Sequence, residues 1–324
     1  MSADSLAFQI LSLLETPGIG PARVNRLLEL WRQKDLSPQQ LTHRAFLESC
    51  LTPGLATAVR DKADTVRRTW DGLREKDVRS IPVFDPLYPA SVRTLLGPQA
   101  PPLLFATGNT ALLEKASVAF CGSRKASEKG MAVAADCAAE LAAHGVNVVS
   151  GYASGVDMHA HRGALEAGGT TILVLAEGML QFRLKREIKD VWDRERTLVV
   201  SEFLPGVPWN VHNAMQRNRT ICALSRALVL IEARTNGGSM AAGRECLRLG
   251  LPLFAAVYEG MPESAEGNRE LLQQGARALR KSRATNRANI RPILAAIEIA
   301  PLALQASGRG TAGTRGTFLW PAGR

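Results

Sequence analysis

The sequence lacks several features that would place it in a common class of protein. Its five cysteines are scattered without a Cys-x-x-Cys pair, which favours buried thiols over disulfides or a zinc site. No apolar run approaches the roughly 18 residues of a membrane span. The start, Met1-Ser-Ala-Asp-Ser5, has neither the basic nor the apolar region of a signal peptide. We therefore expect a cytoplasmic protein that does not contact a membrane.

The common nucleotide-binding and catalytic motifs are also missing. There is no Gly-x-x-x-x-Gly-Lys-Ser/Thr and no Gly-x-Gly-x-x-Gly after an expected strand. In Gly151-Tyr-Ala-Ser-Gly155 the serine, Ser154, stands one position too late for a nucleophile elbow. His159 and His161 are two residues apart and so face different sides of a helix, which favours structural histidines over a metal pair. The sequence thus predicts a binding protein with no catalytic residues, no cofactor and no metal.

Charge and aromatic content restrict the kinds of ligand contact. The formal net charge is +10, but residues 277–324 hold nine basic residues against one acid, Glu298, and so account for +8 of it. The basic balance therefore points first to this C-terminal segment, and any binding role of the remaining chain must rest on local clusters. Aromatic residues are only 5% of the chain. They leave Tyr152, Phe182 and Trp209 as candidates for stacking on a base, with no ground for choosing among them.

Hydrophobic periodicity and proline content divide the chain into four parts. Residues 1–75 show helical spacing throughout and predict a small all-α domain. Residues 76–112 are rich in proline and predict a connector packed on the core, with short strands near 81–84 and 103–106. Residues 113–282 alternate between apolar runs and helical patterns. Residues 283–324 combine a basic helical stretch with a tail rich in Gly, Ser, Thr and Arg, which we expect to be disordered.

The third part carries the main fold prediction. Six short apolar runs predict strands at 118–121, 146–150, 171–176, 197–201, 227–232 and 251–257. Helical patterns lie between most of them, including an Ala-rich one from Glu128 to Ala143. Buried strands separated by helices indicate a parallel sheet with both faces covered. The expected fold is therefore α/β, an extended Rossmann-like parallel sheet domain preceded by the small all-α domain.

Glycine-rich segments follow three of these strands and lead into helices. Ligands of open parallel sheets bind at the carboxyl ends of the strands, where glycines admit a ligand to the backbone and helix N-termini attract anions. A single such loop can be a purely steric turn, but three at one edge predict a phosphate site. The residues that we assign to it are Gly122, Ser123, Arg124 and Lys125, then Ser150, Gly151, Ser154 and Gly155, and finally Gly237, Gly238 and Ser239.

Other polar segments add to this candidate site. Arg217, Asn218 and Arg219 lie near an expected helix start, where they would contact phosphates and base edges or else pair with sheet-edge acids such as Glu202. Lys185 belongs to a basic loop, residues 183–186.

Two further positions have local interpretations. Asp157 is placed to cap the N-terminus of a helix. Pro17-Gly-Ile-Gly20, which precedes a basic helix, fits either a helix-hairpin-helix turn that meets DNA phosphates or a plain tight turn, and the second is favoured.

Taken together, these motifs resemble the DprA/Smf family of bacterial DNA-processing proteins. The resemblance rests on Gly122-Ser-Arg124, Ser150-Gly-Tyr-Ala-Ser-Gly-Val-Asp157 with His161, Ser201-Glu202, Arg217-Asn-Arg219 and Gly238-Ser239, which occur in the family's order. It spans about residues 5–282. The chain departs from the family after Gly178, where Met179-Leu-Gln-Phe-Arg-Leu-Lys-Arg186 replaces the usual Tyr-Pro turn.

The resemblance implies a specific function. It implies a Rossmann-like domain after a small helical domain of the SAM or helix-hairpin-helix kind. It also implies binding of single-stranded DNA largely without sequence preference, a homodimer, and delivery of the strand to the RecA recombinase during DNA uptake (natural transformation) or recombination. By motif, Arg124, the 150–155 loop, Arg217-Asn-Arg219 and Gly238-Ser239 would line the phosphate pocket.

Two alternatives use the same scaffold. One is a nucleotide-sensing, phage-defence or mobile-element module, whose anion pocket would look the same in sequence. The other is an enzyme similar to nucleoside-monophosphate phosphoribohydrolases. Those enzymes need Gly-Gly-x-Gly-Thr-x-x-Glu, whereas Gly237-Gly-Ser-Met-Ala-Ala-Gly-Arg-Glu245 lacks the Gly-Thr pair and sets the acid one residue late. One residue turns a helical side chain by about 100°, so Glu245 would point elsewhere.

Overall fold

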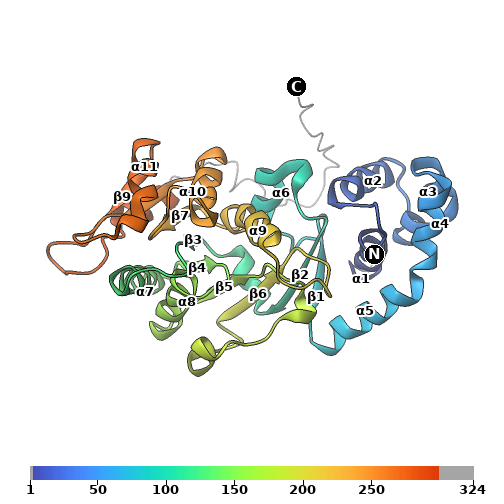
Figure 1. Ribbon diagram of the computed structural model, residues 1–324. Coiled ribbons are helices and arrows are strands. Elements are labelled where there is room, and N and C mark those ends of the chain that lie inside the picture. The colour runs from blue at the N-terminus through green and yellow to red at the C-terminus, as the bar shows by residue number, and fades with distance from the viewer. Residues whose placement is uncertain (1–2, 299–324) are drawn as a thin grey trace.

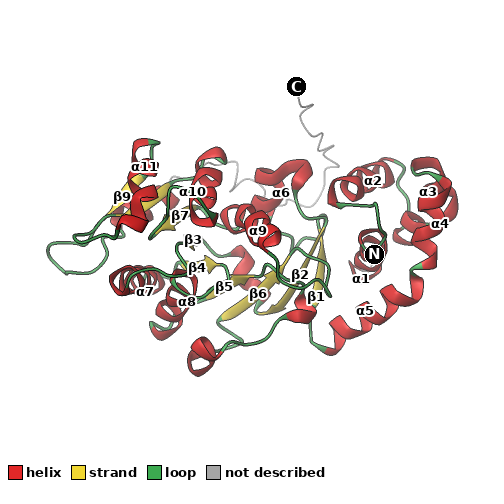
Figure 2. Ribbon diagram, viewed as in Figure 1, coloured by secondary structure: helices red, strands yellow, loops and turns green. Residues whose placement is uncertain are grey.

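The computed structural model describes residues 3–298, and Figures 1 and 2 show the arrangement of its elements. A group of helices formed by the first quarter of the chain lies at one end, and the α/β part extends from it. The predicted C-terminal helical stretch is present as α12 (Arg291–Glu298), while the tail expected to be disordered lies outside the described residues. No helix within residues 3–298 is both long and apolar enough to span a bilayer.

The N-terminal region is helical, as its periodicity predicts. Its elements are α1 (Ala3–Leu14), α2 (Pro21–Gln33), the 3-10 helix η1 (Pro38–Thr42), α3 (Arg44–Cys50), α4 (Pro53–Asp61) and α5 (Ala63–Glu75). Each is short and amphipathic, and the buried faces meet in one core that includes Ile10, Leu28 and Leu47.

A nine-stranded sheet forms the centre of the molecule, in the order β1-β2-β6-β5-β4-β3-β7-β8-β9. Its strands are β1 (Arg79–Pro82), β2 (Leu103–Gly108), β3 (Ser117–Cys121), β4 (Asn147–Ser150), β5 (Thr171–Val174), β6 (Thr197–Ser201), β7 (Ala227–Leu230), β8 (Leu253–Ala256) and β9 (Arg277–Leu279). The seven strands from β6 to β9 pair in parallel. All six predicted central strands are present, which confirms the Rossmann-like α/β prediction.

The proline-rich segment forms two strands of the sheet and is not only a connector packed on the core. Its strands β1 and β2 pair with each other and β2 pairs with β6, both antiparallel, so they extend the sheet itself. Between them lie α6 (Ala90–Leu96) and the 3-10 helix η2 (Gly97–Gln99), although only turns and extended chain were expected there. The prolines flank the seven residues of α6 and do not interrupt them, so a short helix fits between Pro89 and Gly97.

Helices cover both faces of the sheet. On one face α7 (Glu128–Ala143), α8 (Val156–Glu166) and α12 pack on alternate strand residues such as Val118 and Phe120. On the other face α6, α9 (Val211–Ala223), α10 (Gly238–Arg248) and α11 (Glu266–Gln273) pack on the intervening residues such as Ala119 and Cys121. Successive strand residues point to opposite faces, and both faces are covered by helices, so the strands are apolar at nearly every position.

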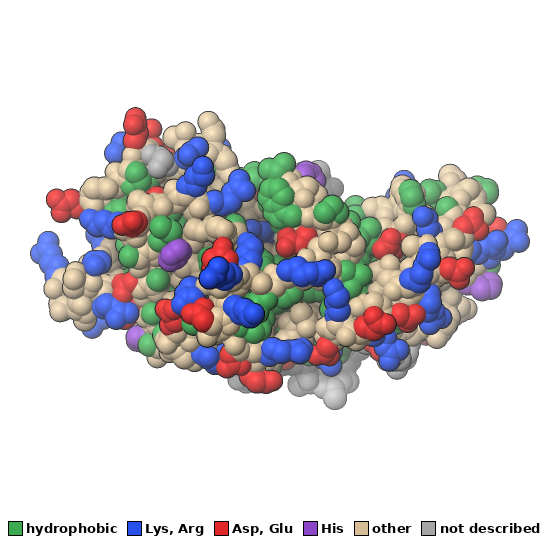
Figure 3. Space-filling view, turned by 60° about the horizontal axis from the view of Figure 1, so that its bottom comes forward, with side chains coloured by type: hydrophobic (Ala, Val, Ile, Leu, Met, Phe, Trp, Pro, Cys, Tyr) green, Lys and Arg blue, Asp and Glu red, His purple; other side chains and the backbone are tan. Residues whose placement is uncertain are grey.

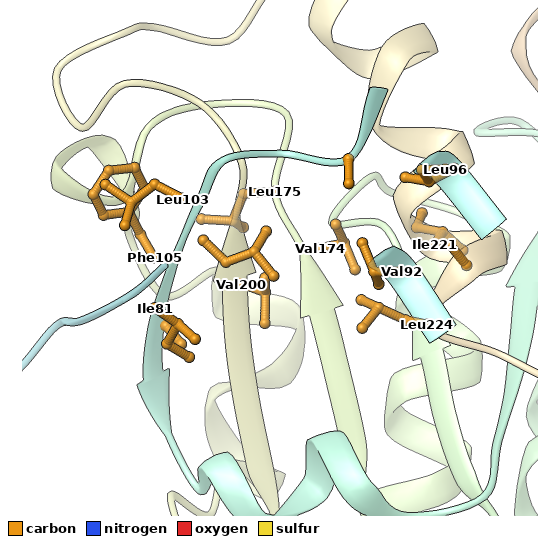
Figure 4. Close-up of a cluster of buried hydrophobic side chains, with 14 of the residues drawn as sticks. Ile81, Val92, Leu96, Leu103, Phe105, Val174, Leu175, Val200, Ile221 and Leu224 are labelled. Atoms are coloured by element: carbon orange, nitrogen blue, oxygen red, sulfur yellow. The ribbon is translucent and has the colours of Figure 1, made fainter. Parts of the chain in front are cut away.

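The connector is anchored by apolar contacts, shown in Figure 4. Val92 and Leu96 of α6 point toward Ile221 of α9 and Leu224, which caps its C-terminal end, next to Val174 of β5. Ile81 and Val200 lie further along the same face, whereas Leu103 and Phe105 point to the opposite face of the sheet. Because α9 is held between α6 and the sheet, its polar residues occupy a fixed position at the strand ends.

Candidate functional site

The predicted glycine-rich loops meet where the strand order reverses. The chain runs from β3 through β4 and β5 to β6 on one side, and β7 then pairs with the other side of β3. Ile231 N donates to Cys121 O (3.0 Å) and Val156 N to Ser123 O (3.4 Å), so the loops after β7, β3 and β4 are adjacent. A switch point of this kind is the usual ligand position in open α/β sheets.

The close contact between two of these loops requires a glycine at position 155. Gly155 has a φ of +83°, in the region that favours glycine, and a Cβ atom there would lie 2.6 Å from Ser123 O. Gly155 also occupies the N-cap position of α8, so Asp157 lies in the first turn and is not the cap that we expected. The physical reason is that the glycine turn already reverses the chain one residue before Val156, and the helix begins there.

Asp157 instead forms a buried ion pair with Arg217 of α9. The Arg217 Nη2 and Asp157 Oδ2 atoms are 3.6 Å apart, and the two side chains are 9% and 7% exposed. The Arg217 guanidinium lies directly against Gly151, where a Cβ atom would overlap it. Arg217 thus fastens α9 to the loop after β4, and its predicted contact with phosphate stays a prediction.

Exposed cationic side chains lie on the loops after β3 and β7, as well as on the loop after β5. Arg124 and Lys125 are exposed, and so is Arg234, which the sequence analysis did not include. None of these three takes part in an ion pair among residues 3–298. Ser154, Gly237 and Gly238 are also exposed, while Gly122, Ser123 and Ser239 are half-buried. In Figure 3, Lys and Arg side chains gather over the middle of one face, with acidic side chains among them.

Lys185 reaches the site from the divergent loop after β5. Its Nζ donates to Tyr152 O and lies 4.4 Å from the centre of the Tyr152 ring. The loop contains the 3-10 helices η4 (Met179–Gln181) and η5 (Arg186–Val191), and Arg162 of α8 holds the second one through Asp190 (2.7 Å). Burial raises the pKa of nearby Glu177, and the positive charge of Lys185 opposes this rise. The loop is therefore fixed, with its lysine next to the β4 loop.

A buried carboxylate holds the loop after β3. Glu232, at the end of β7, is completely buried and accepts hydrogen bonds from Ser127 N (3.0 Å), Ser127 Oγ (2.5 Å) and Tyr258 Oη. Ser127 is the N-cap of α7 and also accepts from Gly130 N (3.0 Å). Sequence reasoning missed this role, because nothing in the spacing of Ser127 and Glu232 shows that they meet.

The polar residues of α9 divide between two surroundings. The helix begins at Val211, capped by Asn210, so Arg217 and Arg219 lie in its middle and not near its start. Gln216 Nε2 donates to Glu202 Oε1 (3.0 Å), and Asn218 Nδ2 donates to Gly238 O (3.2 Å). Arg219 makes a long contact of 3.4 Å with Gln99 Oε1 of η2. The alternative of an ion pair between these arginines and Glu202 is not found among residues 3–298, where the Glu202 carboxylate accepts from Gln216 Nε2 and Thr220 Oγ1.

Both histidines of the 157–161 segment hydrogen-bond within the protein, His159 to Gly155 O (2.9 Å) and His161 to two partners. His161 is fully buried between Thr171 Oγ1 (2.7 Å from Nδ1) and Gly151 O (2.6 Å from Nε2), and burial lowers its pKa to about 4. The His161 side chain therefore stays neutral and holds the loop after β4 through its hydrogen bond to Gly151 O. Within residues 3–298, no group of three His, Cys, Asp or Glu side chains is arranged to hold a metal ion.

Two other predictions can be compared with the geometry. At the N-terminal turn, Arg23 Nη1 donates to Gly18 O of the turn itself (2.8 Å), which fits the plain tight turn. Among the three candidate stacking aromatics, Tyr152 is buried and Phe182 packs against it, with ring centres 5.6 Å apart. Trp209 is 52% exposed and is the most accessible of the three rings.

Comparison with known proteins places this geometry in a family. The family model described as DNA recombination-mediator protein A matches residues 79–288. The chain is 29% identical over 247 residues to DNA processing protein DprA of Bacillus subtilis, covering 71% of this chain and 82% of the relative. It is 32% identical over 200 residues to that of Streptococcus pneumoniae, covering 61% and 70%.

Solved structures agree with these relatives. The X-ray structure of DprA from Streptococcus pneumoniae superposes with a TM-score of 0.71 at 26% identity, covering 84% of this chain and 94% of that one. A structure of DNA processing protein A from Helicobacter pylori, described for its single-stranded DNA binding mode, gives 0.55 at 25% identity, covering 68% and 94%. The matched segment, 79–288, contains all nine strands and every residue of the candidate site. The chain therefore belongs to the family of DNA recombination-mediator protein A, the DprA/Smf proteins.

Proposed function

We propose that this protein binds single-stranded DNA, largely without sequence preference, at the switch point between β3 and β7. The observation that carries the proposal is the convergence of three glycine-rich loops with the exposed side chains of Arg124 and Lys125, which form no ion pair within residues 3–298. Backbone amides and flexible cations contact phosphates without reading bases, which suits a sequence-tolerant ligand. The binding mode named for the Helicobacter relative supports the same ligand class.

The family relationship supports a wider role. In this proposal the protein acts as a homodimer in the cytoplasm and delivers the strand to the RecA recombinase during DNA uptake or recombination. The expected partner assay is recombinase ATP hydrolysis on oligo-dT that is coated with single-strand-binding protein. Addition of the protein should shorten the lag before hydrolysis, and an unchanged lag would remove recombinase delivery from the proposal.

We also propose that the protein catalyses no reaction. The acid nearest to the phosphoribohydrolase pattern, Glu245, is bound by Arg248 of the same helix (2.6 Å). An ion-paired carboxylate with a lowered pKa is a poor proton acceptor. Release of adenine from AMP by the purified protein would contradict this part of the proposal.

The binding proposal is tested by fluorescence anisotropy with labelled oligo-dT and a matched duplex at several salt concentrations. The variant Arg124→Ala with Lys125→Ala should bind oligo-dT at least ten-fold more weakly. Its plot of log K against log salt should be shallower by about 1, because up to two phosphate contacts are lost. The matched control is Arg68→Ala with Arg74→Ala, which removes the same charge from exposed positions on α5. Equal affinities for both variants would show that the loops are not the DNA site.

A further inference from the structure

A hollow of about 490 Å³ lies between α9 and α10, next to the glycine-rich loop after β7. Asn218 of α9 lines it and donates to Gly238 O (3.2 Å), and a Cβ atom on Gly238 would lie 3.4 Å from the sulfur of Met215. The hollow is therefore continuous with the proposed DNA site. Its lining residues are Gln99, Met215, Gln216, Asn218, Arg219, Ala241, Glu245 and Arg248.

The lining has the composition of a nucleobase site. Three amide side chains line the hollow, and each has one polar atom bonded within the protein: Gln216 Nε2 to Glu202, Asn218 Nδ2 to Gly238 O and Gln99 Oε1 to Arg219. Their remaining amide atoms are of the kind that pairs with the edges of bases. Met215 and Ala241 supply an apolar surface against which a flat ring can pack. The volume lies within the range of pockets that hold small organic ligands, roughly 300–1,000 Å³.

The charge of the hollow suits a phosphate beside the base. Arg248 is neutralised by Glu245 at 2.6 Å, and this contact lowers the pKa of the Glu245 carboxyl. Arg219 has no carboxylate within 4.0 Å in the part of the chain that the structure describes. Its Nε atom is buried without a hydrogen-bond partner. The hollow therefore keeps an uncompensated positive charge, which a phosphodiester would neutralise.

Exposed apolar side chains gather near the start of α9, and one of them, Met215, lines the hollow. Among residues 3–298, the large hydrophobic side chains that are exposed are Trp209 (52%), Val211 (67%) and Met215 (41%). They fall within seven residues at the start of α9, and Val211 and Met215 are one helical turn apart. An exposed aromatic ring such as that of Trp209 stacks on bases without regard to their identity, and the two aliphatic side chains extend the apolar surface beside it.

We infer that the hollow between α9 and α10 receives one nucleotide of the bound single strand. Its base lies against Met215 between the amide side chains, and its phosphate pairs with Arg219. The strand enters from the Gly237–Gly238 loop, and Trp209 stacks on a neighbouring base. This inference rests on the proposed function, since it adds base contacts to the phosphate contacts of the loops.

The test compares oligo-dT with an oligonucleotide of equal length that carries abasic sites, by fluorescence anisotropy. The wild type should bind oligo-dT about ten-fold more tightly than the abasic strand, because base stacking adds roughly 1–3 kcal/mol per base. The variant Ala241→Trp fills the hollow from α10 and should lose this preference while binding the abasic strand normally. Met215→Ala, at an exposed position, should reduce the same preference without affecting the fold. The control Ala58→Trp makes the same change at a half-buried position on α4.

The outcomes separate the two proposals. If the wild type binds oligo-dT and the variants Ala241→Trp and Met215→Ala keep its full preference for bases, the hollow is not a base site, although the loops can still be the phosphate site. If the Arg124 and Lys125 variant binds as well as the wild type, the proposed function itself fails. If Ala241→Trp abolishes binding of a recombinase but leaves the base preference unchanged, the hollow belongs to a protein partner and the inference is overturned.

Discussion

Replacing Arg217 with alanine should destabilise the protein far more than replacing Arg219, although both arginines belong to the same motif. Arg217 and Asp157 are nine-tenths buried and face each other at 3.6 Å. Removal of the arginine leaves the Asp157 carboxylate in a nearly dry position, where it retains a single backbone donor, Ala153 N, at 3.3 Å. Breaking a buried ion pair in this way costs about 3–5 kcal/mol. We expect a loss of about 3 kcal/mol, near the lower limit, because the ion pair is long.

The assay is urea unfolding followed by circular dichroism and tryptophan fluorescence. Arg217→Ala should lower the free energy of unfolding by about 3 kcal/mol, while Arg219→Ala, with its single long contact to Gln99, should cost less than about 1 kcal/mol. A domain of this kind is stable by roughly 5–15 kcal/mol, so both variants should still fold.

A double-mutant cycle isolates the ion pair itself. Asp157→Asn, Arg217→Gln and their combination should give a coupling energy of at least about 1 kcal/mol, because the two side chains share one buried site. An Arg217→Ala variant within 1 kcal/mol of the wild type, or additive costs in the cycle, would refute the conclusion that this arginine fastens α9 to the sheet.

Three further predictions concern the support of the loops. Burial holds the pKa of His161 at about 4, below its value of about 6.5 in the unfolded chain, so the unfolded state binds the proton first. The free energy of unfolding should therefore fall by up to about 3 kcal/mol as the pH drops from about 6.5 to about 4. In His161→Gln this pH dependence should vanish from the unfolding curves. Gly155→Ala should cost at least about 2 kcal/mol more than Gly168→Ala in the same assay, since both have positive φ but only the first meets a neighbouring carbonyl. Glu232→Gln should cost about 2 kcal/mol and weaken oligo-dT binding, because an amide nitrogen would face the donors of Ser127; normal stability and binding would assign Glu232 no part in holding the loop.

The central fold was predictable from the sequence because each local pattern had a single interpretation. The six apolar runs became strands β3 to β8, and the Ala-rich pattern from Glu128 to Ala143 became α7 with the same bounds. The edge strands were harder. The runs near 81–84 and 103–106 predicted the short strands β1 and β2, but nothing local shows that β2 pairs with β6. The last strand, Arg277–Leu279, is three residues long and mostly exposed, so it carries no hydrophobic signal.

The site was predictable in its backbone but not in its side-chain directions. One glycine-rich loop after a buried strand can be a purely steric turn, but three successive ones predict a shared edge, and the structure brings the three loops together. Arg217 and Arg219 were treated as one cluster, yet residues two apart on a helix differ by about 200° in direction. One therefore points to the sheet and the other to α10, and only the position of the sheet decides which.

The antiparallel pairing of β2 with β6 determines when the edge of the sheet can fold during synthesis of the chain. Phe105 of β2 pairs with Ser201 of β6, which leaves the ribosome roughly 100 residues later, or about 5–20 s at ordinary rates of elongation. Until then the apolar residues of β1 and β2 have no sheet to join, while the preceding helices can already pack together. A nascent chain paused before residue 200 should therefore expose the apolar residues of β1 and β2 next to a folded helical region. We expect chaperones to bind the nascent chain mainly before β6 has been synthesised.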